Sequence, residues 1–341
     1  MHTRRIAIWA LAFGLAATFG CQQARQFQTK LAIDHYVRGQ LLADRGQFDA
    51  ALAELAKAAK IAPDLSVVYS AIGDIHRNRG DYCQARVSYE TACEKNPYSF
   101  KPHYNLGVVY QSLAAAASKA EEIAEYFRQA ANVYLRAAAL CPDDFDAHLN
   151  LSACYYLMGK HDLAEKYCKA AIVLDAKRPE AYSNLGIIYD SQGQDYQAIK
   201  AYRDSLELDV HQPKLLMNLG ATYVKQGRLK PALQAFQMAA REDPNSPDAW
   251  EQLGTCQYHL KDYGQALQSY QRAIERDPSN AAALRGLGVV YMTQYVLARD
   301  KSELREKALA AWHASLELNP NQKDIVALVR KYAVKPADPN L

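Results

Sequence analysis

The sequence repeats itself with a period of about 34 residues, a length typical of arrays in which each repeat is one supersecondary unit. This period restricts the possible folds more than any other feature. Seven glycines mark it, and Ser152 divides the one longer interval, between Gly107 and Gly186. The glycines are Gly39, Gly73, Gly107, Gly186, Gly220, Gly254 and Gly288. The chain is therefore predicted to be a stack of similar units.

Other positions keep the same register in each repeat. An alanine follows twelve residues after the glycine, a large side chain sixteen residues after it and often a proline twenty-four residues after it, with the interval lengthened in two repeats. The alanines are Ala51, Ala85, Ala130, Ala164, Ala198, Ala232, Ala266 and Ala308. The large residues are Leu55, Tyr89, Tyr134, Tyr202, Phe236, Tyr270 and Trp312, with Cys168 as a smaller exception.

Each repeat is predicted to contain two amphipathic helices. Apolar residues recur at spacings of three and four, as in Ala181, Leu185 and Ile188 of one repeat. Glycine and alanine at the crossing let the two backbones approach, while the large side chain fills the volume beside them. Proline ends the second helix because it cannot donate the backbone hydrogen bond. One hairpin cannot bury both of its faces, so the hairpins must stack.

This pattern resembles the tetratricopeptide repeat from residue 32 to residue 322. The resemblance implies an all-α fold, namely a right-handed superhelix of eight helical hairpins followed by a C-terminal capping helix. The eight units are expected at residues 32–65, 66–99, 100–144, 145–178, 179–212, 213–246, 247–280 and 281–322. The capping helix is expected at residues 323–334 and a tail at residues 335–341.

Two repeats are longer than the others. The third carries eleven extra residues within 112–125, and the eighth carries eight within 293–304. Alanine, glutamate, lysine and leucine dominate both insertions, so the extra length is predicted to be helical. Insertions of about three and two helical turns keep the packing face in phase.

The beginning of the chain differs from the repeats. Arg4 and Arg5 precede an apolar run over residues 6–20 that is too short to span a bilayer. This order is typical of a secretory signal peptide, so residues 1–20 are predicted to be removed on export. Residues 21–31 would then form a tether in front of the first repeat.

The residues around Cys21 resemble the bacterial lipobox, although Thr18 stands where that motif prefers leucine. The resemblance implies that Cys21 is lipidated and that the protein is an outer-membrane lipoprotein facing the periplasm. Simple cleavage of the signal, which would leave a free Cys21, is the alternative.

Charge and cysteine spacing exclude several classes of partner. Removal of residues 1–20 takes away two of the 40 basic residues and leaves 38 against 37 acidic ones, so no strong field favours nucleic acid. The remaining six cysteines lack the spacing of a zinc site, and no metal or other cofactor is expected. Cys154 and Cys168 either face each other across one hairpin or remain buried free thiols.

A side-chain amide occupies the sixth position of five consecutive repeats. These amides are Asn105, Asn150, Asn184, Asn218 and Gln252. In the tetratricopeptide family, positions 2, 5, 6, 9, 12 and 13 point toward the concave surface. A carboxamide both donates and accepts, so a row of them can bind the main chain of an extended peptide whatever its side chains are. The row resembles the asparagine ladder of O-linked N-acetylglucosamine transferases. The alternatives are that the amides join neighbouring repeats or stay solvated.

Aromatic side chains accompany the amides in the expected groove. Tyr104, Tyr156 and Tyr258 are predicted to anchor a bound peptide. Lysines such as Lys101 and Lys225 are expected to form a solvated rim with nearby carboxylates. The ninth position holds no asparagine, so the carboxylate clamp of the chaperone-binding members of the family is absent.

The sequence contains no motif of a catalytic nucleophile, a phosphate-binding loop or a catalytic metal. We therefore expect a non-catalytic scaffold of the cell envelope that binds an extended peptide or a partner helix of another protein in its concave groove and has no small-molecule substrate. Two alternatives remain open. One is an accessory subunit of an envelope enzyme or polymer-export complex, and the other is an assembly lipoprotein for pili or secretion pores.

Overall fold

The computed structural model describes residues 27–298 and 301–333, and every regular element within them is a helix. The predicted signal peptide, Cys21 and the tail at 335–341 lie outside the described residues. The first described helix covers residues 27–44, so residues 27–31, expected as the end of a tether, belong to this helix instead.

The helices fall into two units, which are described separately. The N-terminal unit ends at Asp175, and after the helix at 27–44 it contains α2 (Phe48–Ile61), α3 (Ser66–Arg79), α4 (Tyr82–Lys95), α5 (Phe100–Ala116), α6 (Ala120–Leu140), α7 (Phe145–Leu157) and α8 (His161–Leu174). The C-terminal unit begins at Ala176 and contains α9 (Pro179–Ser191), α10 (Asp195–Leu208), α11 (Pro213–Lys225), α12 (Leu229–Glu242), α13 (Pro247–His259), α14 (Tyr263–Arg276), α15 (Ala281–Ala298), α16 (Ser302–Leu318) and α17 (Lys323–Ala333).

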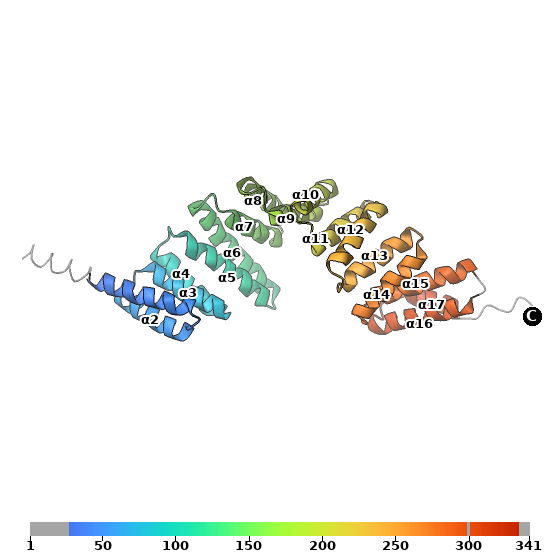
Figure 1. Ribbon diagram of the computed structural model, residues 1–341, viewed down its shortest axis with the longest axis horizontal. Helices are drawn as coiled ribbons and strands as arrows, with labels where there is room; N and C mark the ends of the chain where they lie inside the picture. The colour runs from blue at the N-terminus through green and yellow to red at the C-terminus, as the bar shows by residue number, and fades with distance from the viewer. Residues whose placement is uncertain (1–26, 299–300, 334–341) are drawn as a thin grey trace, which may run out of the picture. The chain divides into compact units, whose positions relative to one another are not determined.

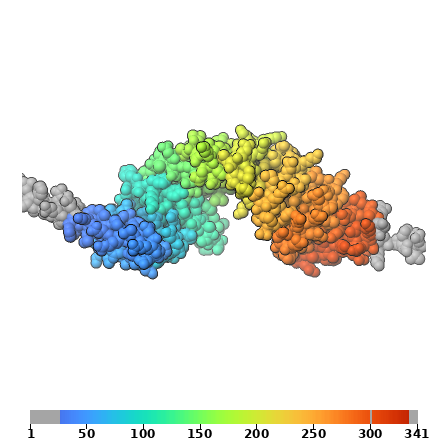
Figure 2. Space-filling model, viewed as in Figure 1, coloured from blue at the N-terminus to red at the C-terminus, as the bar shows by residue number. Residues whose placement is uncertain are grey.

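Within each unit, consecutive helices form hairpins, and each hairpin packs against the next (Figure 1). In the space-filling view, successive hairpins of the same unit adjoin one another (Figure 2). Alanine is the commonest buried residue, because small side chains allow the helices to approach, and larger buried side chains such as Tyr89, Tyr134 and Phe236 fill the space beside it.

The two helices of a hairpin approach most closely where the glycine of the first helix faces the large residue of the second. Tyr202 is 1% exposed, and a Cβ atom on Gly186 would overlap its ring. The fourth hairpin has Ser152 in place of the glycine and Cys168 in place of the large residue. The hydroxyl of Ser152 donates a hydrogen bond of 2.7 Å to the carbonyl of Ala164, and the smaller Cys168 is fully buried nearby. The small-to-large pairing predicted from the sequence is therefore present.

A left-handed residue reverses the chain between the two helices of six hairpins. Five of these turns use a glycine with φ between 69° and 80°, a conformation that costs glycine little. The glycines are Gly46, Gly80, Gly159, Gly193 and Gly227. In the seventh hairpin Lys261 takes this place with φ 65°.

The extra residues of the third and eighth repeats lengthen helices. Helices α5 and α6 contain 17 and 21 residues, and α15 and α16 contain 18 and 17, whereas the other paired helices from α2 onward contain 13 or 14. The last helix, α17, buries Ile325 against Trp312 of α16. The predicted fold class, an all-helical array of hairpins with a final covering helix, is confirmed. Among the described residues, no helix combines the length and apolar character that crossing a membrane requires.

Candidate functional site

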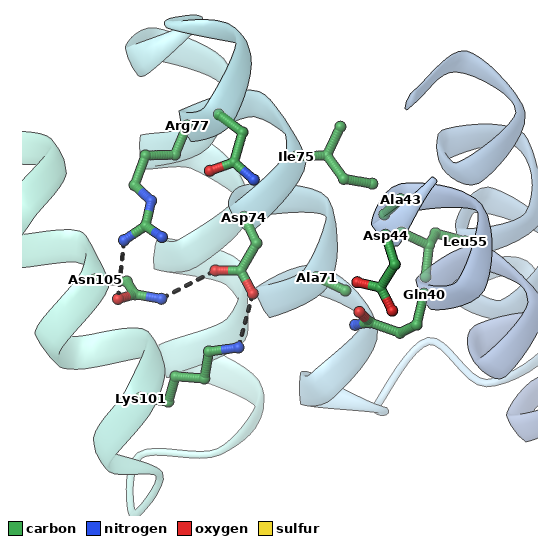
Figure 3. Close-up of a pocket in the computed structure, with 11 residues that line it drawn as sticks. Gln40, Ala43, Asp44, Leu55, Ala71, Asp74, Ile75, Arg77, Lys101 and Asn105 are labelled. Carbon is green, nitrogen blue, oxygen red and sulfur yellow. Dashed lines mark hydrogen bonds and ion pairs between the residues drawn. The ribbon is translucent and has the colours of Figure 1, made fainter. Parts of the chain in front are cut away.

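A cavity of about 350 Å³ opens on the first helices of three consecutive hairpins in the N-terminal unit (Figure 3). We call it the Asp74 cavity. Residues of the helix at 27–44, of α3 and of α5 line it, together with Leu55 of α2. Most of its lining residues occupy positions 2, 6, 9, 12 and 13 of the repeat. These are positions that the family resemblance assigns to the concave surface.

Asp74 is the centre of a hydrogen-bond network in this cavity. Its carboxylate accepts hydrogen bonds from Lys101 Nζ at 2.8 Å, from Asn105 Nδ2 at 2.9 Å and from the Tyr89 hydroxyl at 2.5 Å. Burial raises the pKa of Tyr89 far above its usual value, and the bond to Asp74 adds to this shift. Tyr89 therefore stays protonated and remains a donor. The bonds to Lys101 and Asn105 join the second repeat to the third.

The side chain of Asn105 is not available to a bound peptide. It is 5% exposed, and while its Nδ2 donates to Asp74, its Oδ1 accepts a hydrogen bond of 3.2 Å from Arg77. Both ends of the amide are thus occupied by the preceding repeat. At this position the alternative holds, since the carboxamide joins neighbouring repeats.

The opposite side of the cavity carries polar groups with spare hydrogen-bonding capacity. Gln40 and Asp44 extend from the first helix on one side, and Asp74, Lys101 and Asn105 lie on the other (Figure 3). The side chains of Gln40 and Asp44 form no hydrogen bond with another described residue. The cavity therefore offers both acceptors and donors to a guest, with the charges of its lysine and arginine balancing those of its two carboxylates.

Asn150 also contacts the preceding repeat. Its Nδ2 donates a hydrogen bond of 3.2 Å to the hydroxyl of Tyr104. The Tyr104 ring stacks on Phe100 with centroids 5.6 Å apart and meets Tyr134 edge-on at 5.7 Å. Tyr104 is half-buried, so its ring belongs partly to the packing of the third hairpin.

Asn184 and Asn218 differ from the first two amides. They lie one repeat apart on α9 and α11 of the C-terminal unit and are half-buried. Neither carboxamide forms a hydrogen bond with another described residue. Beside them, Lys225 donates to Asp190 at 2.8 Å, which confirms the close approach of opposite charges between these repeats. Two consecutive repeats thus present unoccupied amides.

The fifth amide, Gln252, is bound within its own helix. Its Nε2 donates to Glu251 at 2.8 Å, and Thr255 donates to the other carboxylate oxygen at 3.0 Å. Burial raises the pKa of the Glu251 carboxyl, and these two donors together with the charge of Arg285 only partly oppose the shift. Keeping the Glu251 carboxyl group ionised in the folded protein therefore costs free energy.

The two other predicted aromatic anchors are half-buried. The Tyr156 ring lies 5.7 Å from the ring of His161. The Tyr258 hydroxyl lies 3.2 Å from the hydroxyl of Thr293 in the next repeat. Each ring is partly accessible, and its role as an anchor for a peptide stays a prediction.

The described residues contain no cluster of histidine, cysteine or carboxylate groups that could hold a metal ion. Cys154 and Cys168 are buried free thiols, and burial raises the pKa of each to about 12. At neutral pH they are therefore protonated and poor nucleophiles.

Sequence reasoning missed the acceptor at the centre of the cavity. Asp74 stands at position 9 and Asn105 at position 6 of the next repeat, and neither position alone indicates a bond between them. A search for acidic and amide residues 31 positions apart would have found the pair. The lysine expected on a solvated rim, Lys101, is indeed 65% exposed but reaches Asp74.

The fold and the polar inner positions define a class of protein, the tetratricopeptide-repeat proteins. The family described as "Cilia and flagella-associated protein 70 C-terminal domain", a tetratricopeptide-repeat family, matches residues 22–287. The chain belongs to this family. The tetratricopeptide fold is one that binds other proteins or peptides.

Curated relatives match shorter stretches. The chain is 33% identical over 93 residues to Superkiller complex protein 3 of Mus musculus, a match that covers 27% of this chain and only 5% of that protein. It is 30% identical over 122 residues to Photosystem I assembly protein Ycf3 of Cuscuta obtusiflora, covering 34% of this chain and 73% of that protein.

Solved structures show the same fold. The crystal structure of YrrB, described as a tetratricopeptide-repeat protein with an unusual peptide-binding site, is similar with a TM-score of 0.52 and 23% identity. The similarity covers 59% of this chain and 99% of that one. At this identity the likeness supports the fold alone.

Proposed function

We propose that this protein is a non-catalytic scaffold that binds the main chain of an extended peptide segment on the inner positions of its repeats. The observation that carries the proposal is the pair of unoccupied carboxamides of Asn184 and Asn218. Each can donate to a peptide carbonyl and accept from a peptide N–H, and they recur at the same position of consecutive repeats. The Asp74 cavity in the N-terminal unit offers a second, more polar place for a partner side chain.

The amides act on the main chain, so binding should tolerate changes of the guest's side chains. Ile187, three residues after Asn184 on α9, is half-buried and supplies an apolar contact on the same helix. Hydrogen bonds orient the guest, and apolar contacts of this kind contribute most of the binding free energy.

The test begins with capture of the partner. A photo-crosslinking amino acid at position 187 should capture a segment of it, whereas the same group at Tyr196, which is 79% exposed on the second helix α10, should not. The captured segment is then synthesised with and without N-methyl groups on its main chain. We expect N-methylation to weaken binding at least tenfold, because it removes donors that the amides require.

A matched pair of variants separates binding from stability. Asn184→Ala together with Asn218→Ala should weaken binding of the unmodified segment and leave the melting temperature unchanged, since neither amide bonds to another described residue. Gln197→Ala with Gln234→Ala removes two exposed amides from the second helices α10 and α12 and should change neither property. Equal affinity in both double variants would exclude the amide clamp.

The location in the cell envelope is part of the proposal and rests on the resemblance of residues 1–21 to a signal peptide with a lipobox. Growth with labelled palmitate should mark the full-length protein, and Cys21→Ser should abolish the label. A mature protein that is unlabelled and soluble without detergent would remove the anchor from the proposal.

An assembly role is the second candidate, and one observation favours it. The chain is 30% identical to a protein whose name describes assembly of photosystem I, over 73% of that protein. If the captured partner is a subunit of a larger envelope complex and that complex fails to form without this protein, the scaffold acts in assembly. A captured synthase or hydrolase would instead favour the role of accessory subunit.

A further inference from the structure

The C-terminal unit contains a second cavity, of about 200 Å³, between α12, α13 and α14, which are neighbours in Figure 1. Its wall includes Trp250, the guanidinium groups of Arg241 and Arg272, and four glutamine side chains. No carboxylate stands among the described residues that line it. We call it the Trp250 cavity, and it shares no lining residue with the Asp74 cavity or with the amide pair.

The cavity lies beside a position at which the seventh repeat differs from most of the others. The eleventh position is tyrosine in five of the eight repeats, as Tyr110, Tyr155, Tyr189, Tyr223 and Tyr291. In the seventh repeat it is Gln257, which is 4% exposed. Its amide accepts a hydrogen bond of 2.7 Å from Ser269 and donates one of 3.2 Å to Gln265. A smaller polar side chain thus replaces a ring and leaves space with a hydrogen-bonded wall.

Arg272 is oriented by stacking. Its guanidinium lies 4.6 Å from the centre of the Trp250 ring, and the indole nitrogen of Trp250 donates a hydrogen bond of 3.0 Å to the carbonyl of Pro244. A guanidinium stacked on an aromatic face keeps its N–H groups at its edge, where they can bind an oxyanion with two parallel hydrogen bonds.

The positive charge of the cavity is not neutralised within the part of the chain that the structure describes. Neither Arg241 nor Arg272 forms an ion pair with a described residue, whereas the neighbouring Arg276 pairs with Glu275 at 3.1 Å. Two guanidinium groups and several amide donors therefore surround a space that holds one small group.

We propose that the Trp250 cavity binds a single oxyanion, the carboxylate or phosphate of an acidic or phosphorylated side chain on a partner protein. The guanidinium of Arg272 supplies the paired hydrogen bonds, Arg241 supplies the second charge, and the glutamines on the wall donate to the remaining oxygens. The site is independent of peptide binding on the inner positions, and a partner can occupy both.

The test uses the purified mature chain and two probes, inorganic phosphate and the side-chain carboxylate of N-acetylglutamate amide, at constant ionic strength. Calorimetry measures affinity, and the change in tryptophan fluorescence on binding reports occupancy, since Trp250 lines the cavity whereas Trp312 is buried in the last hairpin. At least one probe should bind with a single site. Binding of phosphate alone would assign the site to phosphorylated side chains, and binding of the carboxylate would assign it to acidic ones.

Three variants decide whether the cavity is the site. Arg272→Gln should weaken binding at least tenfold. Gln257→Tyr introduces the ring that five other repeats carry and should abolish binding, while the lost hydrogen bonds to Ser269 and Gln265 should lower the melting temperature only modestly. Arg203→Gln, an exposed arginine on α10, should leave affinity unchanged.

The proposal is overturned if neither probe binds, or if Arg203→Gln weakens binding as much as Arg272→Gln does. It is also overturned if Gln257→Tyr is folded, with a cooperative melting transition, and still binds. Should that variant fold poorly, the comparison of Arg272→Gln with Arg203→Gln decides alone.

Discussion

The carboxylate of Asp74 and the carboxamide of Asn105 are joined by a hydrogen bond of 2.9 Å that crosses from one repeat to the next. The same amide accepts a bond from Arg77, so Asn105 closes a network between α3 and α5. An asparagine at the sixth position therefore has two possible roles in this protein, as a contact between repeats or as an open amide. Which role it takes depends on the residue that the preceding repeat presents.

The two roles predict different effects on stability. Asn105→Ala should lower the free energy of unfolding by about 1–3 kcal/mol, because it leaves partners of the buried amide without a hydrogen bond. Asn218 stands at the same position of a later repeat. Asn218→Ala should change the free energy of unfolding by less than about 0.5 kcal/mol, because its amide bonds to no described residue. Urea unfolding followed by circular dichroism measures both. A loss for Asn105→Ala as small as that expected for Asn218→Ala would show that the Asn105 network contributes little to stability.

Gly186 is predicted to be intolerant of any side chain. A Cβ atom there would overlap the buried ring of Tyr202, so Gly186→Leu should force the two helices of the hairpin apart and cost about 3 kcal/mol. Gly264→Ala is the control, since its Cβ would lie 4.0 Å from the Asp262 side chain, at ordinary contact distance. That variant should be neutral or slightly stabilising, because alanine favours the helix. Thermal melting of the two variants distinguishes overlap from a general effect of losing glycine.

Lys261 carries backbone strain that five other turns avoid. Its φ of 65° lies in the left-handed region, where a residue with a Cβ atom is disfavoured by about 1 kcal/mol or more. Lys261→Gly should therefore raise the free energy of unfolding by about 0.5–1 kcal/mol, the usual scale of such backbone effects. The reverse change at the equivalent turn, Gly227→Lys, should lower it by a similar amount. A loss of stability in Lys261→Gly would mean that the lysine side chain compensates for the strain.

Glu251 should make stability depend on pH. Its folded pKa is raised by burial, so the folded state binds the proton more tightly than the unfolded state does. Stability from this group is therefore greatest below the unfolded pKa and falls as the pH rises through the folded pKa. Glu251→Gln removes this loss. The free energy of unfolding of the variant, measured relative to the native protein, should be higher at pH 7 than at pH 4. A difference that does not change with pH would contradict the assignment.

The repeat period was sufficient to predict the fold. Gly186, Tyr202 and their counterparts meet within one hairpin, where the spacing along the chain and the geometry of a helix determine which side chains touch. The helical character of the two insertions followed from their composition for the same local reason.

The candidate site could be predicted only in part. The sequence by itself placed the amides on the inner positions, because their register in the repeat determines which face of the helix they occupy. Only the tertiary structure decided that Asn105 is buried against Asp74 while Asn184 and Asn218 stay open. Those contacts form between repeats, and they depend on the size and charge of side chains that lie almost a full repeat apart in the sequence and follow no period.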